Sequence, residues 1–294
     1  MPKTVEQGFE AFLTELKPSK SEYDKAASHK NSVSESLQKN FSCYKFFETG
    51  SFGARTGIRH YSDADFFAAI PSEKLYTNSS TSLRVIKESL QQRFSSTPNI
   101  IVNCPSVRIP FGIYASETME ITPCCFDGLV ETPCGKFERW EIPNCHEGDW
   151  MYSSPAAHNA YVNRENDRLS EKVKPLIQLV KAWKYYNSVP ISSFYLELRV
   201  TKYCQSEPAI VYDIDLQNFF ESLKENNLAK MRDPMGISGL IPACSSDSKK
   251  EEALSKINTG LTRIIKAREA ENVGNTNSAF NWWDIFFGYS FPSR

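Results

Sequence analysis

The stretch that decides the fold runs from Glu48 to Ile70 and reads ETGSFGARTGIRHYSDADFFAAI. It places a glycine-serine turn upstream of two aspartates, Asp63 and Asp65, which stand two positions apart beside an apolar run. In a strand, residues i and i+2 face the same side, with Cα atoms about 7 Å apart. The two carboxylates therefore converge, and they repel each other by roughly 1–4 kcal/mol at a surface-like dielectric constant.

A divalent cation would relieve that repulsion, and oxygen-only ligation suits Mg²⁺ or Mn²⁺. Taken alone, the Asp-x-Asp pattern is weak evidence, because solvated strand edges produce it often. Two nearby features strengthen the case for a metal site. The turn holding Gly50 and Ser51 can present N–H groups and a hydroxyl to phosphate oxygens, and Glu120 lies in a further candidate strand, TMEITP. Three carboxylates on adjacent strands can hold two metals on a nucleoside triphosphate, so the combination predicts nucleotidyl transfer.

Length and composition indicate a globular chain with capacity for a large core. The chain has 294 residues, of which 40% are hydrophobic and 23% charged. No window approaches the roughly 18 apolar residues of a membrane span, and the N-terminus lacks the pattern of a signal peptide. We therefore expect a cytoplasmic protein with no membrane segment. The net charge of −1 and the lack of a basic stripe argue against a long nucleic-acid ligand.

The eight cysteines are scattered and include no C-x-x-C pair. In a reducing cytosol this favours free, mostly buried thiols. A zinc site is the alternative, and zinc ligands usually come in pairs two to four residues apart, a spacing that these candidates do not show. The candidates for it are Cys124, Cys125, Cys134, Cys145 and His146.

The spacing of apolar residues changes along the chain. The first forty residues have helical spacing, and short apolar runs that suggest strands follow as far as about residue 131, with one helix at 80–94. Residues 132–155 show neither helical nor strand periodicity and are expected to form a structured connection. The remainder is helical, with Pro175 at a kink or a helix start. The expected fold class is α+β, with a first domain at 1–155 and a helical domain at 156–294.

The segment TGSFGARTGIRHYSDADFFA resembles the signature of polymerase-β-type nucleotidyltransferases. More narrowly, it is similar to the bacterial cyclic-oligonucleotide synthases related to cyclic GMP-AMP synthase, the CD-NTase family. The resemblance covers roughly residues 46–292, and it implies a mixed sheet with flanking helices packed on a C-terminal helical domain that completes the nucleotide-binding cleft. Further segments that carry it are GKFERWEIPNCHEGDWMYSSPAAHNAYVNREN, PLIQLVKAWKYYNSVPISSFYLELRV, RDPMG and NWWDIFFGYSFP.

The resemblance also implies roles for residues of the first domain. Gly50 and Ser51 would hold the triphosphate. Asp63, Asp65 and Glu120 would be the catalytic carboxylates and would bind two Mg²⁺ ions, for which Mn²⁺ could substitute. Glu120 stands where many members of the family have aspartate, and its extra methylene group still permits ligation.

In the helical domain, the resemblance implies that Lys181 and Ser193 reach the phosphates of the donor nucleotide. Phe194 would stack on a base, at a position where relatives often have tyrosine. Each residue also has a structural alternative. Lys181 could be a solvated helix lysine, Ser193 a helix N-cap, and Phe194 part of the core.

The implied function is synthesis of a cyclic di- or trinucleotide from NTPs, ATP or GTP or both, in bacterial antiphage (CBASS) signalling. The product would act on a separate effector protein, and the synthase would be a monomer that needs no long nucleic acid as activator. One alternative is a nucleotidyltransferase that modifies a small molecule, a protein or an RNA end. A non-catalytic nucleotide-binding module ranks lower, because all three carboxylates and the Gly-Ser pair are present.

Overall fold

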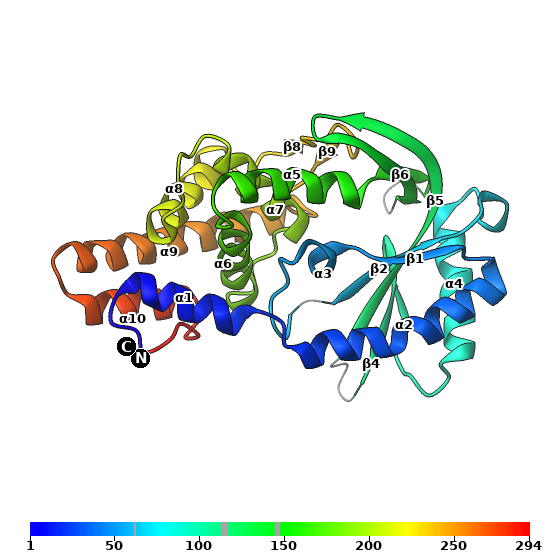
Figure 1. Ribbon diagram of the computed structural model, residues 1–294, viewed down its shortest axis with the longest axis horizontal. Helices are drawn as coiled ribbons and strands as arrows, with labels where there is room; N and C mark the ends of the chain where they lie inside the picture. The colour runs from blue at the N-terminus through cyan, green and yellow to red at the C-terminus, as the bar shows by residue number, and fades with distance from the viewer. Residues whose placement is uncertain (62, 113–116, 145–147) are drawn as a thin grey trace. The chain divides into compact units, whose positions relative to one another are not determined.

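The computed structural model describes residues 1–61, 63–112, 117–144 and 148–294 (Figure 1). The chain divides into two compact units, here called the sheet unit and the helical unit. The sheet unit consists of residues 18–160 and 235–238, and the helical unit of residues 1–17, 161–234 and 239–294. The α+β class expected from the sequence is confirmed.

The sheet unit is built on a mixed sheet with the strand order β1-β2-β5-β4-β3, and β6 and β7 continue from β5. Strands β2 and β5 are parallel, whereas β1 with β2 and β4 with β5 are antiparallel. The strands are β1 (Lys45–Glu48), β2 (Ala64–Ala69), β3 (Ile101–Asn103), β4 (Ser106–Phe111), β5 (Glu117–Thr132), β6 (Gly135–Pro143) and β7 (Trp150–Ser153).

Two helices, α2 (Lys20–Phe41) and α4 (Ser79–Arg93), cover one face of this sheet (Figure 1). Their apolar residues pack against alternate positions of β2, where Phe66 and Ala68 are almost fully buried. This alternation follows from the two-residue period of a strand, and it leaves the intervening residues on the opposite face. Two short helical segments complete the unit, α3 (Gly50–Ala54) and η1 (Ser72–Lys74).

The connection predicted for residues 132–155 contains two strands, β6 and β7, which the sequence analysis missed. Strand β6 pairs with the second half of β5, and a bulge between Phe126 and Gly128 interrupts their register. The bulge and the many polar positions obscure the strand period in the sequence. Strand β4 is one of the short apolar runs expected to be strands, and it ends at Phe111.

The helical unit contains most of the remaining elements. In the stretch after residue 155 that was expected to be helical, the structure has two helices before residue 187, because the chain turns at Ser170 and Glu171, both with positive φ. Pro175 lies in the first turn of the second one, at a helix start as predicted. The elements are α1 (Val5–Leu16), α5 (Pro155–Arg168, which crosses the division between the units), α6 (Val173–Tyr186), α7 (Ser193–Cys204), α8 (Tyr212–Glu225), β8 (Met231–Arg232), β9 (Leu240–Ile241), α9 (Asp247–Asn272) and α10 (Thr276–Phe286).

Helix α1 belongs to the helical unit, whereas the sequence analysis grouped it with the first domain. It packs against α6, α8 and α10. The reason is its apolar stripe: the ring of Phe9 lies 4.9 Å from that of Trp283, and the ring of Phe12 lies 4.6 Å from that of Phe287. Aromatic burial of this kind dominates core energetics, so the helix packs where aromatic partners are available.

The cysteines agree with the expectation of free thiols at six positions and disagree at one. Cys104 is disulfide-bonded, so the prediction of a free thiol is wrong there. Of the five zinc candidates, Cys145 and His146 lie outside the described residues. The free thiols are Cys43, Cys124, Cys125, Cys134, Cys204 and Cys244.

Across the described ranges, no helix is both long enough and apolar enough to cross a membrane.

Candidate functional site

The carboxylates of the sheet unit meet at the parallel ladder between β2 and β5. Asp65 and Glu120 stand directly opposite each other in this ladder. Their neighbours Ala64 and Met119 are paired in the same way, and both are buried in the core beneath α2 and α4. Since side chains alternate along a strand, Asp65 and Glu120 share the opposite face. Asp63 immediately precedes β2, two positions from Asp65 as the sequence indicated.

Asp63 is held in surroundings that disfavour its charge. Burial and the nearby carboxylate of Glu120 raise the pKa of Asp63 to about 6, and the guanidinium of Arg108 lowers it only in part. Burial disfavours an ionised carboxyl group, and a like charge disfavours it further. The charge of Glu120 thus adds to the effect of burial on Asp63.

Two residues at this edge were missed by the sequence analysis, Asn103 and Arg108. Asn103, on β3, donates a hydrogen bond from Nδ2 to Glu120 Oε1 over 2.7 Å. Arg108, on β4, stands opposite Glu120 in the antiparallel ladder with β5. The available signal was the alternation in SVRIPF, which puts Arg108 on the other side from the buried Val107 and Ile109. That alternation does not reveal which strand β4 pairs with, so it could not connect Arg108 with Glu120.

The Gly-Ser turn lies directly against Asp65. The Thr49 N–H donates to the Asp65 backbone carbonyl over 2.9 Å, and Gly50 and Ser51 then begin α3. Gly50 has φ +55°, and a Cβ added there would lie 1.9 Å from Asp65 Oδ2. Only glycine allows both this backbone conformation and this approach. The structure therefore places Gly50 against Asp65, which stands opposite Glu120 in the ladder. Asp63 feels the charge of Glu120, and Ser51 follows Gly50 in α3.

The chemistry of this donor set fits a hard divalent cation, because carboxylate oxygens are the ligands that Mg²⁺ prefers. The hydrogen bond from Asn103 holds Glu120 by one oxygen and leaves the other available. As the side chains stand, the described part of the chain contains no group of three acidic, histidine or cysteine residues gathered as a metal site.

The residues predicted for the donor nucleotide lie in the helical unit, on α6 and α7. Lys181 is 1% exposed and forms an ion pair with Glu197 over 2.7 Å, so it is not a solvated helix lysine. The N-cap of α7 is Ser192, which accepts from the Tyr195 N–H, and Ser193 is the first helical residue. The N-cap alternative for Ser193 is therefore wrong.

Two further observations concern the same helix pair. Phe194 is 36% exposed, which rules out the alternative that it belongs to the core. Lys184, which the sequence analysis did not single out, donates a 2.6 Å hydrogen bond from Nζ to Ser193 Oγ. Burial, and to a smaller extent the charge of Lys181, lowers the pKa of Lys184 to about 8, while Glu197 opposes that shift. Nothing in the sequence distinguishes Lys184 from other lysines of an amphipathic helix.

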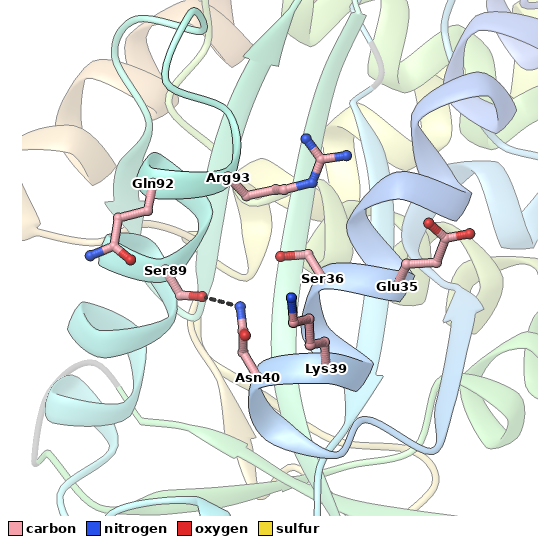
Figure 2. Close-up of a pocket in the computed structure, with 7 residues that line it drawn as sticks. All are labelled: Glu35, Ser36, Lys39, Asn40, Ser89, Gln92 and Arg93. Atoms are coloured by element: carbon pink, nitrogen blue, oxygen red, sulfur yellow. Dashed lines mark hydrogen bonds between the residues drawn. The ribbon is translucent and has the colours of Figure 1, made fainter.

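A separate pocket lies between α2 and α4 (Figure 2). Lys39 and Glu35 line it from α2 and Arg93 from α4, and Asn40 Nδ2 donates to Ser89 Oγ across it. These helices cover the face of the sheet opposite to the carboxylates. The pocket is therefore not part of the carboxylate site.

Residues 3–166 match the Second Messenger Oligonucleotide or Dinucleotide Synthetase domain, SMODS. The chain belongs to this family. The SMODS match agrees with the resemblance to the CD-NTase family seen in the sequence, and with the enzyme class expected from it, a nucleotidyltransferase. The match includes the Gly-Ser turn and all three carboxylates, and it ends before α6.

Among its relatives, this SMODS chain is similar to a probable cyclic nucleotide synthase of Bacillus cereus (strain VD146). The two are 29% identical over an alignment of 152 residues, which covers 50% of this chain and only 44% of that protein. A protein of Acinetobacter sp. (strain ATCC 27244 / 9458) named cyclic AMP-AMP-AMP synthase is 23% identical, over 98% of this chain and 86% of that protein.

Among solved structures, that of E. coli MS115-1 CdnC with ATP superposes with a TM-score of 0.75 at 17% identity. The superposition covers 98% of both chains. At this level of identity the likeness shows the fold, and it extends that fold to the helical unit, beyond the SMODS match.

Proposed function

We propose that this chain is a cyclic oligonucleotide synthase, which joins NTPs into a cyclic di- or trinucleotide and releases pyrophosphate. The observation that carries the proposal is the pairing of Asp65 with Glu120 across the parallel ladder, with Asp63 beside them and Gly50 packed on Asp65. Membership of the SMODS family and similarity to proteins named as cyclic nucleotide synthases support it.

In this proposal Asp63, Asp65 and Glu120 bind two Mg²⁺ ions, or Mn²⁺ in their place. When bound, the metal supplies charge neutralisation at the leaving pyrophosphate and lowers the pKa of the acceptor hydroxyl. The turn at Gly50 and Ser51 steadies the triphosphate against the carboxylates. Positioning of this kind accounts for much of the catalysis in phosphoryl transfer, because the protein forms no covalent bond to the substrate.

The residues of α6 and α7 serve the donor nucleotide. Lys181 and Ser193 contribute charge and a hydroxyl to the donor phosphates, and the exposed ring of Phe194 stacks on a base. The acceptor ribose attacks the donor α-phosphate in line. The linear product then re-enters in the flipped orientation for a second transfer, which closes the ring.

The biological setting we propose is bacterial antiphage (CBASS) signalling in the cytoplasm. The cyclic product activates a separate effector protein, and the synthase acts as a monomer on ATP, GTP or both. The net charge of −1 supports activity without a long nucleic-acid activator, since binding to a duplex is driven by a basic surface.

The test is a reaction of the purified protein with all four NTPs and Mg²⁺ and no added acceptor. Phosphatase treatment and mass spectrometry should reveal phosphatase-resistant cyclic species, and nuclease digestion should assign the linkage. Turnover only in the presence of an added small molecule, protein or RNA would instead support a modifying nucleotidyltransferase. Duplex DNA should leave the rate unchanged, and strict dependence on it would contradict the proposal.

A further inference from the structure

Ser193, the serine that the proposed function assigns to the donor phosphates, is contacted by Lys184. The Lys184 Nζ donates to Ser193 Oγ over 2.6 Å, and the hydroxyl of Tyr185 lies 3.2 Å from the same oxygen. Lys181, by contrast, donates to Glu197 Oε1 over 2.7 Å and is buried. Lys181 and Lys184, both on α6, therefore have different surroundings.

The charge of Lys181 is compensated, whereas that of Lys184 is not. Within the described residues, no carboxylate lies within ion-pair distance of the Lys184 Nζ, which sits 4.6 Å from the centroid of the Tyr185 ring. Burial and Lys181 lower the pKa of Lys184 to about 8, and Glu197 only partly opposes this. An ammonium group held in this way gains from an anionic partner, since an opposite charge favours the ionised form.

We propose that Lys184 is a further phosphate-binding residue of this chain and acts together with Ser193 on the donor triphosphate. This inference rests on the proposed function. The ammonium group has three N–H donors, and the bond to Ser193 uses one of them. The flexible stem lets the group follow phosphate oxygens as a point charge. Lys181 differs from Lys184 in that its ion pair with Glu197 also joins α6 to α7.

Calorimetry tests the role of Lys184. It compares the affinity for a non-hydrolysable ATP analogue with Mg²⁺ with the affinity for AMP. Lys184→Gln removes the charge but keeps an N–H donor for Ser193, and it should weaken binding of the triphosphate about 10- to 100-fold. Binding of AMP should weaken much less. Lys184→Arg keeps the charge and should stay within a few-fold of wild type. The matched control is Lys202→Gln, at an exposed position of α7, which should leave both affinities unchanged.

Equal triphosphate affinity in wild type and Lys184→Gln would overturn the inference, as would an equal loss for AMP and triphosphate. Melting curves show whether Lys184→Gln is folded, and Lys184→Met provides a second uncharged variant if it is not. A wild-type protein that binds no triphosphate would contradict the proposed function itself. Triphosphate binding by wild type and by Lys184→Gln alike would contradict only the role of Lys184.

Discussion

The carboxylate edge of β2 and β5 and the lysine pair of α6 have opposite signs but share a physical property. In each region, charges of one sign are only partly compensated by neighbouring charges of the opposite sign. At the sheet, Arg108 only partly offsets the burial and the Glu120 charge that act on Asp63. On α6, Glu197 pairs with Lys181 and leaves Lys184 without an ion-pair partner among the described residues. Such imbalance costs stability, and each region would gain from a ligand of the opposite charge, a cation at the sheet and an anion at α6.

The two regions also titrate in opposite senses. The pKa of Asp63 is raised to about 6, so its charge destabilises the fold above that pH. The pKa of Lys184 is lowered to about 8, so its charge destabilises the fold below that pH. Between about pH 6 and 8 both groups are ionised against the preference of their surroundings.

The largest effect is expected at the carboxylates. Asp65→Asn or Asp63→Asn should lower pyrophosphate release by about 10³-fold or more, because each removes a charged metal ligand from the proposed site. A coupled pyrophosphate assay measures this. Glu131→Gln, at an exposed position farther along β5, is the control and should retain the wild-type rate. Wild-type turnover in both aspartate variants would show that the metal assignment is wrong.

Gly50→Ala should lower turnover about 100-fold and destabilise the protein by about 1–3 kcal/mol. The added Cβ would overlap the carboxylate of Asp65 and would also sit at positive φ. Gly274→Ala separates these two causes, because Gly274 also has positive φ but has open space around it. Urea unfolding should show a cost for both variants, while steady-state turnover should fall only for Gly50→Ala. An equal fall in both would mean that contact with Asp65 is irrelevant.

Asn103→Ala should raise the Mg²⁺ concentration required for half-maximal turnover about 10-fold. Residues that orient metal ligands typically affect metal affinity by that much, and Asn103 holds one oxygen of Glu120. Direct Mn²⁺ binding without nucleotide gives a second readout. Asn40→Ala removes an amide hydrogen bond on α2, on the other face of the sheet, and should change neither quantity. An unchanged metal requirement in Asn103→Ala would remove its positioning role.

Lys184 should make nucleotide binding depend on pH. Raising the pH from 7 to 9 should weaken triphosphate binding to wild type by a few-fold, because Lys184 loses its proton as the pH passes about 8. Lys184→Arg should show a smaller loss, since arginine stays charged throughout this range. Both proteins experience the same titration of the nucleotide. Parallel curves for the two proteins would exclude Lys184 as the titrating group.

The smallest effect is one of stability. In metal-free buffer at pH 7, Asp63→Asn should be more stable than wild type by on the order of 1 kcal/mol, because the neutral amide removes a disfavoured charge. The difference should shrink as the pH falls below about 6, where Asp63 itself becomes protonated. Thermal melting at pH 5 and pH 7 measures it. A variant less stable than wild type at pH 7 would indicate that the Asp63 charge is well compensated.

The sheet edge was largely predictable from sequence, because strand alternation is a local rule. Asp65 and Glu120 each stand between buried residues, and this fixes their face without knowledge of the partner strand. What could not be predicted is which side chains support them. Asn103 stands 17 positions before Glu120 and reaches it only through the order of β3, β4 and β5.

The helical site was less predictable. Helical spacing places Lys181 and Lys184 on one helix, but the burial of Lys181 depends on Glu197, which α7 contributes. Sequence alone therefore did not show which lysine is internal and which contacts Ser193. The strands β6 and β7 were missed for a similar reason, since their pairing with β5 and with each other is a tertiary property that overrides weak local pattern.

The division of the chain has a practical consequence for truncated versions of the protein. The backbone passes from one unit to the other four times, after residues 17, 160, 234 and 238. A fragment cut to the SMODS match, residues 3–166, would keep α1 but discard the aromatic partners of Phe9 and Phe12. Such a fragment would expose two phenylalanines that the whole chain buries, and it should aggregate on expression although it retains every acidic residue of the proposed catalytic site.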